Sequence, residues 1–156
     1  MYATIMEQLS MMMKTRASFS TPIRASVETL WSVLKDKAEN PGRYVPGFIE
    51  SEVLERNPDN MLCRLYTDRF DIVERITVDE DNHAVYFDLL DHPDVIGLLI
   101  NKIEKEPSVD GYPILSYAYD WQQRQSSGEA GDMSNIVQNA LQRAKEIAEK
   151  QEEDKQ

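Results

Sequence analysis

The chain of 156 residues has the length of one domain and can bury a sizeable core without a disulfide or a metal ion. Its 28 acidic and 17 basic side chains give a net charge of −11, which disfavours binding to nucleic acids and to anionic lipid surfaces. Cys63 is the only cysteine, and no apolar run is long enough to span a bilayer, so we expect a cytoplasmic protein with no membrane insertion.

The segment 1–14 precedes the first predicted element and is expected to be an N-terminal extension that could form a helix. It has no basic cluster and no long apolar stretch, which argues against a signal peptide. The sequence leaves open whether residues 1–10 belong to the native protein. A single domain is expected over 15–150, followed by a frayed tail at 151–156.

The domain opens with a predicted strand and a predicted helix. The segment 15–22 is partly β-branched and ends at a proline, which favours a strand. Ser26 is a candidate N-cap for a helix that the sequence Asn40-Pro41-Gly42 ends. The helix has one apolar stripe, in which Trp31 is expected to belong to the core: Val27, Leu30, Trp31, Leu34 and Ala38.

Six further strands are predicted, joined by turns with no helix between them. They cover residues 48–55, 61–66, 70–78, 83–90, 95–104 and 112–123. Parallel pairs would need crossovers of about a dozen residues, so this spacing predicts an antiparallel meander.

The polar segment 124–131 predicts a flexible linker, after which Asp132 or Ser134 would cap a long final helix. The apolar stripe of that helix runs from Ile136 to Ala148 and is rich in alanine. An antiparallel sheet must cover its apolar face, and this helix is the element with a matching stripe. A pocket is expected between the two, where ligands commonly bind.

Four phrases carry a resemblance to a known family: 25–34 (ASVETLWSVL), 74–77 (ERIT), 97–104 (GLLINKIE) and 115–121 (LSYAYDW). With the order of elements, they resemble the START / Bet v 1-like superfamily, also called SRPBCC or helix-grip proteins, and most of all its AtaL-like branch. The resemblance implies an α+β fold in which a curved antiparallel sheet of about seven strands wraps around a long C-terminal helix. It also implies a cavity for lipids, sterols, polyketides or other apolar ligands. Some members of the superfamily are aromatases or cyclases, but the branch supplies no catalytic motif that can be carried over to this chain.

Glu74 is the charged residue of most interest. In a regular strand over 70–78 it shares a face with the apolar residues Phe70, Ile72, Ile76 and Val78. A carboxylate on such a face is costly unless it is paired, hydrated or protonated, so it could anchor a ligand hydroxyl or act as an acid or base. Alternatively, a bulge or edge position would let Glu74 reach water or pair with Arg64 or Arg75.

Asn101 repeats this pattern between Leu99 and Ile103, where its amide could bind a ligand carbonyl or lie at a bulge. Tyr119 and Trp121 share a strand face with Tyr117, and aromatic rings with polar tips suit either a cavity wall or a structural stripe.

Other chemistry has little support. The only histidines, His83 and His92, lack metal-ligand spacing and are expected on the surface, so no metal site is predicted. Cys63 is expected to be buried and unreactive. The sequence has no G-x-S-x-G nucleophile elbow and no glycine-rich phosphate loop, and no cofactor is expected.

The leading hypothesis is therefore a protein that binds or carries a small hydrophobic molecule, such as a lipid or polyketide. Glu74, Asn101 and Tyr119 would supply polar contacts, and Phe87 and Trp121 an apolar wall. One alternative is a polyketide cyclase- or aromatase-like enzyme with Glu74 as acid or base. Another is a protein-interaction module that docks through its acidic surface and long helix, with its cavity filled by side chains. The sequence leaves the oligomeric state open.

Overall fold

The computed structural model describes residues 14–92, 95–123 and 130–155. The expected N-terminal extension, except its last residue, and most of the expected linker lie outside these residues. The elements follow in this order: β1 Lys14–Pro22, α2 Val27–Glu39, a short 3₁₀ turn Pro41–Arg43, β2 Phe48–Arg56, β3 Asn60–Thr67, β4 Asp71–Asp79, β5 Ala84–Asp91, β6 Val95–Ile103, β7 Ile114–Gln123 and α3 Ala130–Asp154.

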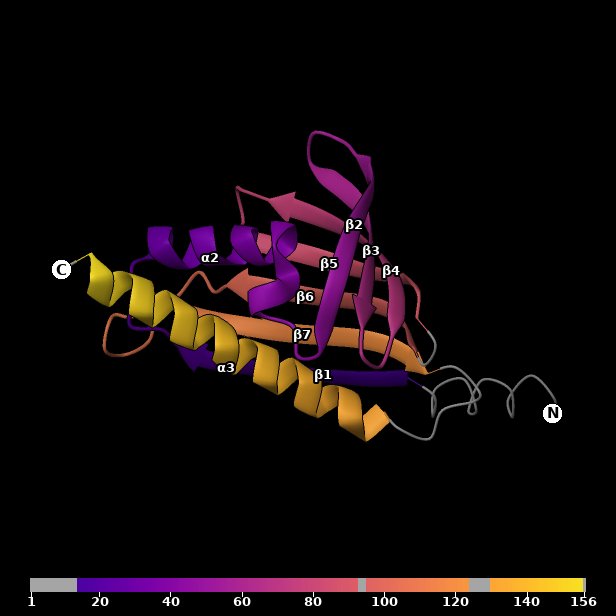
Figure 1. Cartoon of the computed structure of the whole chain (residues 1–156). Helices are drawn as coiled ribbons and strands as arrows, with labels where there is room; N and C mark the ends of the chain where they lie inside the picture. The colour runs from indigo at the N-terminus through magenta and orange to yellow at the C-terminus, as the bar shows by residue number, and fades with distance from the viewer. Residues whose placement is uncertain (1–13, 93–94, 124–129, 156) are drawn as a thin grey trace, which may run out of the picture.

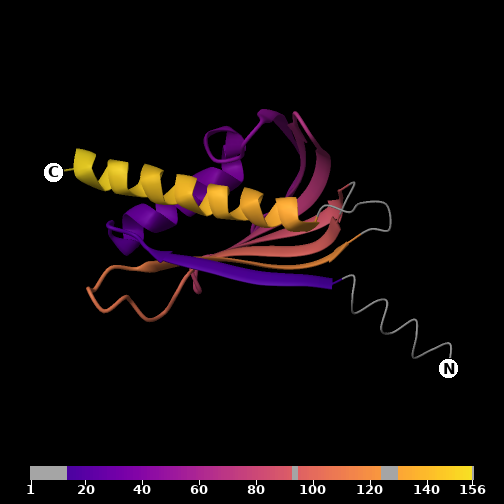
Figure 2. The ribbon, with the colours of Figure 1, turned by 90° about the horizontal axis from the view of Figure 1, so that it is seen from below.

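The strands form one antiparallel sheet with the order β1-β7-β6-β5-β4-β3-β2 (Figure 1). Strands β2 to β7 pair with their neighbours in sequence, as the meander prediction required, while β1 pairs with β7. Figure 2 shows the sheet curving and both long helices lying over the same face. The helix-grip prediction is therefore confirmed.

The core fills the space between the curved sheet and the helices. In β5, Val85, Phe87 and Leu89 alternate onto the covered face and are all buried, as the period of two predicts. From α2, Leu30 and Val33 are fully buried against the sheet. Each such side chain stabilises the fold by about 1.5–3 kcal/mol.

Helix α2 begins and ends where the sequence predicts. The Ser26 hydroxyl oxygen accepts a hydrogen bond from the backbone N–H of Thr29 over 3.1 Å, which satisfies one of the free donors of the first turn. The helix ends at Glu39, before Pro41. Trp31 is buried in the core, and its indole N–H donates to Glu80 on the rim over 2.6 Å.

Helix α3 is longer at both ends than the sequence indicated. It begins at Ala130, inside the expected linker and ahead of both expected caps. It also continues to Asp154, through most of the segment expected to fray from Gln151. The C-terminal turns are held by the start of α2, since the backbone N–H of Ser26 donates to Glu152 over 2.6 Å.

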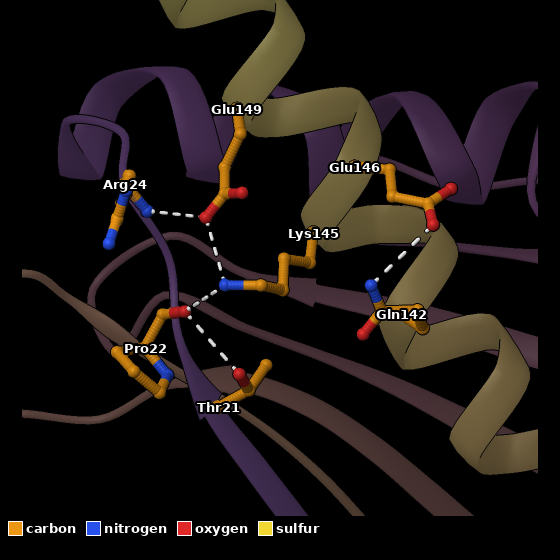
Figure 3. A network of polar contacts seen from close by, with 7 residues as sticks. All are labelled: Thr21, Pro22, Arg24, Gln142, Lys145, Glu146 and Glu149. Carbon is orange, nitrogen blue, oxygen red and sulfur yellow. Dashed lines mark hydrogen bonds and ion pairs between the residues drawn. The ribbon is translucent and has the colours of Figure 1, made fainter.

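A polar network fixes α3 over the junction between β1 and α2 (Figure 3). The Lys145 ammonium donates to the carbonyl of Pro22 over 2.7 Å and to Glu149 over 2.9 Å. Glu149 also accepts the backbone N–H of Arg24 over 2.9 Å. These contacts hold the helix that covers the sheet. Neither this helix nor α2 is long and apolar enough to cross a membrane.

Candidate functional site

A pocket of about 260 Å³ lies between the curved sheet and the two helices. Its wall is mainly apolar, and it includes Leu65, Ile72, Ile76, Phe87, Leu89 and Val137. An apolar cavity of about 150 Å³ accommodates benzene, so this pocket has room for a compact molecule of one or two rings.

Glu74 lines this pocket from β4, between Ile72 and Ile76. Its side chain is half-buried. Burial raises the pKa of the Glu74 carboxyl from 4.5 to about 7, and the positive charge of Lys37 opposes that rise. The carboxyl can therefore give up or accept a proton near neutral pH.

The two arginines that could have neutralised Glu74 have other partners. Arg64 pairs with Asp71 over 3.4 Å, and Arg75 donates to Asn60 over 2.8 Å. The register between β4 and β5 does shift between Val73 and Glu74, but the extra residue is Leu90 of β5, and β4 pairs with β3 without a shift. Glu74 therefore remains on the pocket face.

Lys37 is a buried basic residue of the pocket wall, and it was not among the site residues predicted from the sequence. It enters from α2 and is only 6% exposed. Its ammonium donates to Asn101 Oδ1 over 2.7 Å and lies over the rings of Phe87 and Tyr117, 4.7 and 4.5 Å from their centroids. Burial lowers the pKa of Lys37 from 10.5 to about 8, while the charge of Glu74 opposes the shift.

Asn101 contacts Lys37 and does not itself line the pocket. It is 1% exposed, and its Oδ1 is the acceptor for the lysine. Its Nδ2 has no hydrogen-bond partner among the described residues. The structure therefore places Asn101 where it orients a pocket residue.

The aromatic residues of β7 have different positions. Tyr117 and Trp121 line the pocket, and within the described part of the chain neither the Tyr117 hydroxyl nor the Trp121 indole N–H has a hydrogen-bond partner. Tyr119 is buried and stacks on Trp121, with ring centroids 4.2 Å apart, but it does not line the pocket. Burial raises the pKa of the Tyr117 hydroxyl far above its usual range, so it stays protonated.

The expectation that both histidines lie on the surface is wrong for His92. Its side chain is fully buried and lines the pocket, where its ring packs 4.6 Å from that of Phe70. Its Nδ1 accepts the backbone N–H of Val95 over 3.2 Å. His83 is half-buried beside Trp31. The described residues contain no group of three or more His, Cys, Asp or Glu that could hold a metal ion.

Cys63 is buried in β3 and lines the pocket. Burial raises the pKa of its thiol to about 11, and the negative charges of Glu74 and Glu39 add to the rise. The thiol is therefore a weak nucleophile at neutral pH.

The curved seven-stranded sheet, closed by a C-terminal helix, defines a protein of the Bet v 1-like, helix-grip class. Residues 18–153 match the family described as acetylaranotin biosynthesis cluster protein L, or AtaL, and the chain belongs to that family. No curated protein matches the sequence significantly.

Three solved structures share the fold at low sequence identity. The ZhuI aromatase/cyclase from Streptomyces sp. R1128 is 15% identical with a TM-score of 0.71, over 87% of this chain and 94% of that one. The di-domain ARO/CYC StfQ from the steffimycin biosynthetic pathway is 14% identical with a TM-score of 0.76, over 96% of this chain and 56% of that one. Ara h 8.0201 is 11% identical with a TM-score of 0.67, over 86% of this chain and 97% of that one. These similarities establish the fold alone.

Proposed function

We propose that this protein binds a small, largely apolar molecule in the pocket between the sheet and α3, as a carrier or holder of that molecule. One observation carries the proposal: Trp121 and Tyr117 line a largely apolar pocket, and within the described residues neither the Trp121 indole N–H nor the Tyr117 hydroxyl has a hydrogen-bond partner. A buried donor left unpaired costs about 1–3 kcal/mol. A ligand that offers acceptor atoms to these donors would remove that cost.

A direct test uses the protein purified from the cells that make it. We expect native mass spectra to show one small molecule per chain, and denaturation to release an apolar compound for identification. Ala140→Phe adds a ring to a buried position of the pocket wall, so this variant should lose the molecule. Gln138→Phe adds the same ring to an exposed position of α3 and should retain it. If Ala140→Phe retains the molecule at full stoichiometry, the pocket is not its binding site.

A second candidate function is catalysis on the bound molecule, with Glu74 as acid or base. The observation that favours it is the pKa of about 7 for a carboxyl in the pocket wall, because a general base works best when its pKa lies near the operating pH. Two of the fold neighbours are aromatase/cyclases. Glu74→Gln should then retain the ligand but abolish its conversion, and an unchanged rate in this variant would argue against the role. The pocket argues against the third hypothesis, an interaction module whose cavity is filled by side chains.

A further inference from the structure

We propose that the ligand is a small apolar acid, and that Lys37 pairs with its ionised oxygen atom, such as a carboxylate, an enolate or a phenolate. This inference rests on the proposed binding function and specifies the class of molecule. It assigns to Lys37 the role of the main polar anchor.

Several neighbours of Lys37 stabilise its charged form and so offset part of the cost of its burial. Asn101 offers a carbonyl oxygen at 2.7 Å, and two ring faces lie within 4.7 Å of the nitrogen. Carbonyl oxygens and ring faces both attract a cation, and an ammonium has three N–H groups to share. The amide of Asn101 accepts only one of them, so the lysine retains donor capacity toward the pocket that it lines.

The charge of Lys37 is not fully compensated. Its hydrogen-bond partner is a neutral amide, and within the described part of the chain the carboxyl of Glu74 acts on it through charge without forming an ion pair. A buried charge without an ion-pair partner is costly, whereas a hydrogen-bonded pair of opposite charges offsets much of that cost. An anionic oxygen of the ligand would supply the missing partner.

Two further residues of the pocket wall, Trp121 and Tyr117, carry donors that lack a partner within the described part of the chain. An indole N–H can only donate, so Trp121 requires an acceptor, and the hydroxyl of Tyr117 can donate as well. Four carboxyl residues of the pocket wall could repel an anion. Glu39, Glu52 and Asp68 are exposed, so solvent screens their charges, while burial favours the protonated form of Glu74, which donates a hydrogen bond. A ligand with oxygen acceptors on an apolar ring system matches this set of atoms, whereas a cationic ligand would meet Lys37 with like charge.

Two probes of almost equal shape isolate the charge. 1-Naphthoate and 1-naphthamide share a two-ring body and differ in whether the substituent is an anion or a neutral amide. We would measure both affinities calorimetrically on the full chain at about pH 6, where burial still keeps Glu74 largely protonated. The wild type should prefer 1-naphthoate by about tenfold or more, because a hydrogen bond to a charged group is the stronger kind.

Lys37→Met should remove this preference while 1-naphthamide still binds. Lys35→Met is the matched control. Lys35 lies on the same helix, and its ammonium forms an ion pair with the exposed Glu80, so this substitution should leave the preference for 1-naphthoate intact. If Lys37→Met does not fold, as near-UV circular dichroism would show, Lys37→Gln gives the same test with a side chain that can still donate to Asn101.

The outcomes separate the inference from the function on which it rests. Equal affinity of the wild type for the two probes, or a preference that persists in the Lys37 variants, overturns the inference and leaves the binding function intact. If neither probe binds the wild type, both are contradicted. A preference that is present in the wild type and in Lys35→Met but absent from the Lys37 variants supports the assignment of Lys37 as the anion anchor.

Discussion

The ammonium of Lys37 and the side-chain carbonyl of Asn101 join helix α2 to strand β6 through a buried hydrogen bond of 2.7 Å. The two residues are 64 positions apart in sequence. Asn101 lies opposite Tyr117 in the sheet register, so the bond ends beside the strand that supplies the aromatic wall of the pocket. The contact therefore links α2, the sheet and the candidate site.

A double-mutant cycle should show strong coupling between these two residues. Asn101→Leu should lower the free energy of unfolding by about 2–3 kcal/mol, because it leaves the buried ammonium without its acceptor. Lys37→Met alone leaves the amide of Asn101 unpaired and should cost less. The double variant removes both groups and should be close to wild type in stability, so the coupling energy should be at least about 2–3 kcal/mol, which is what Asn101→Leu costs alone. Urea denaturation measures all four values, and strictly additive effects would contradict the coupling.

Glu74 should give the fold a distinctive dependence on pH. Its pKa is raised from 4.5 in the unfolded chain to about 7 in the folded one, so folding takes up a proton between these values. The free energy of unfolding should therefore fall as pH rises from 4.5 to 7, by an amount on the order of 2–3 kcal/mol. Lys37 has the opposite effect at higher pH. Its pKa is lowered from 10.5 in the unfolded chain to about 8 in the folded one, so its contribution to the free energy of unfolding should rise with pH between these values.

The contribution of Glu74 is best measured as a difference. Carboxyls on the surface, such as Glu39 beside Arg56, have lowered pKa values, so their own effect on stability falls mainly below pH 4.5. Glu74→Gln retains these groups and lacks the raised one, so it should gain stability relative to the wild type as pH rises from 4.5 to 7. Parallel stability curves for the two proteins would show that Glu74 titrates normally.

The sequence predicted the fold and the position of Glu74 because both follow from strand periodicity. The alternation of apolar residues in β4 and β5 determines which face is covered, and Ile72 and Ile76 therefore bring Glu74 to that face. A bulge within β4 would have reversed this assignment, since a shift by one residue exchanges the faces of a strand, but the one register shift beside Val73 places its extra residue, Leu90, in β5. Sequence patterns do not reveal such shifts.

Lys37 was missed although its position carried a signal. Lys37 lies seven residues after Leu30 and three after Leu34, and residues at these spacings share one face of a helix. Lysine is almost never fully buried, however, so this spacing alone did not predict its burial. Its burial depends on Asn101, a partner from a distant strand that no local pattern identifies. The burial of His92 and the N-terminal turns of α3 were also not predicted. The composition of a turn does not show which way a ring packs, and the composition of a polar segment does not show where it becomes helical.

The network in Figure 3 should make Lys145 important for the closure of α3. Lys145→Met removes the donor to Pro22 and Glu149 while retaining the apolar stem, so we expect a loss of about 1 kcal/mol and a fall in Tm of about 2–4 °C. Lys150→Met is the control, since Lys150 forms an exposed pair with Asp154 on the same helix and should change Tm little. Equal shifts in the two variants, measured by calorimetry, would show that the network does not hold the helix.

Cys63 offers a reporter of the pocket in the unmodified protein, because it is the only cysteine of the chain. Its thiol is buried and has a pKa of about 11, so the thiolate fraction at pH 8 should be about a hundredfold below that of an unperturbed cysteine. Labelling with a disulfide reagent at pH 8 should therefore be at least that much slower in the folded protein than in urea. Because Cys63 lines the pocket, a bound naphthalene probe should slow labelling further. Labelling as fast as in urea would mean that the thiol is open to solvent, and a rate unaffected by saturating probe would place the probe outside this pocket.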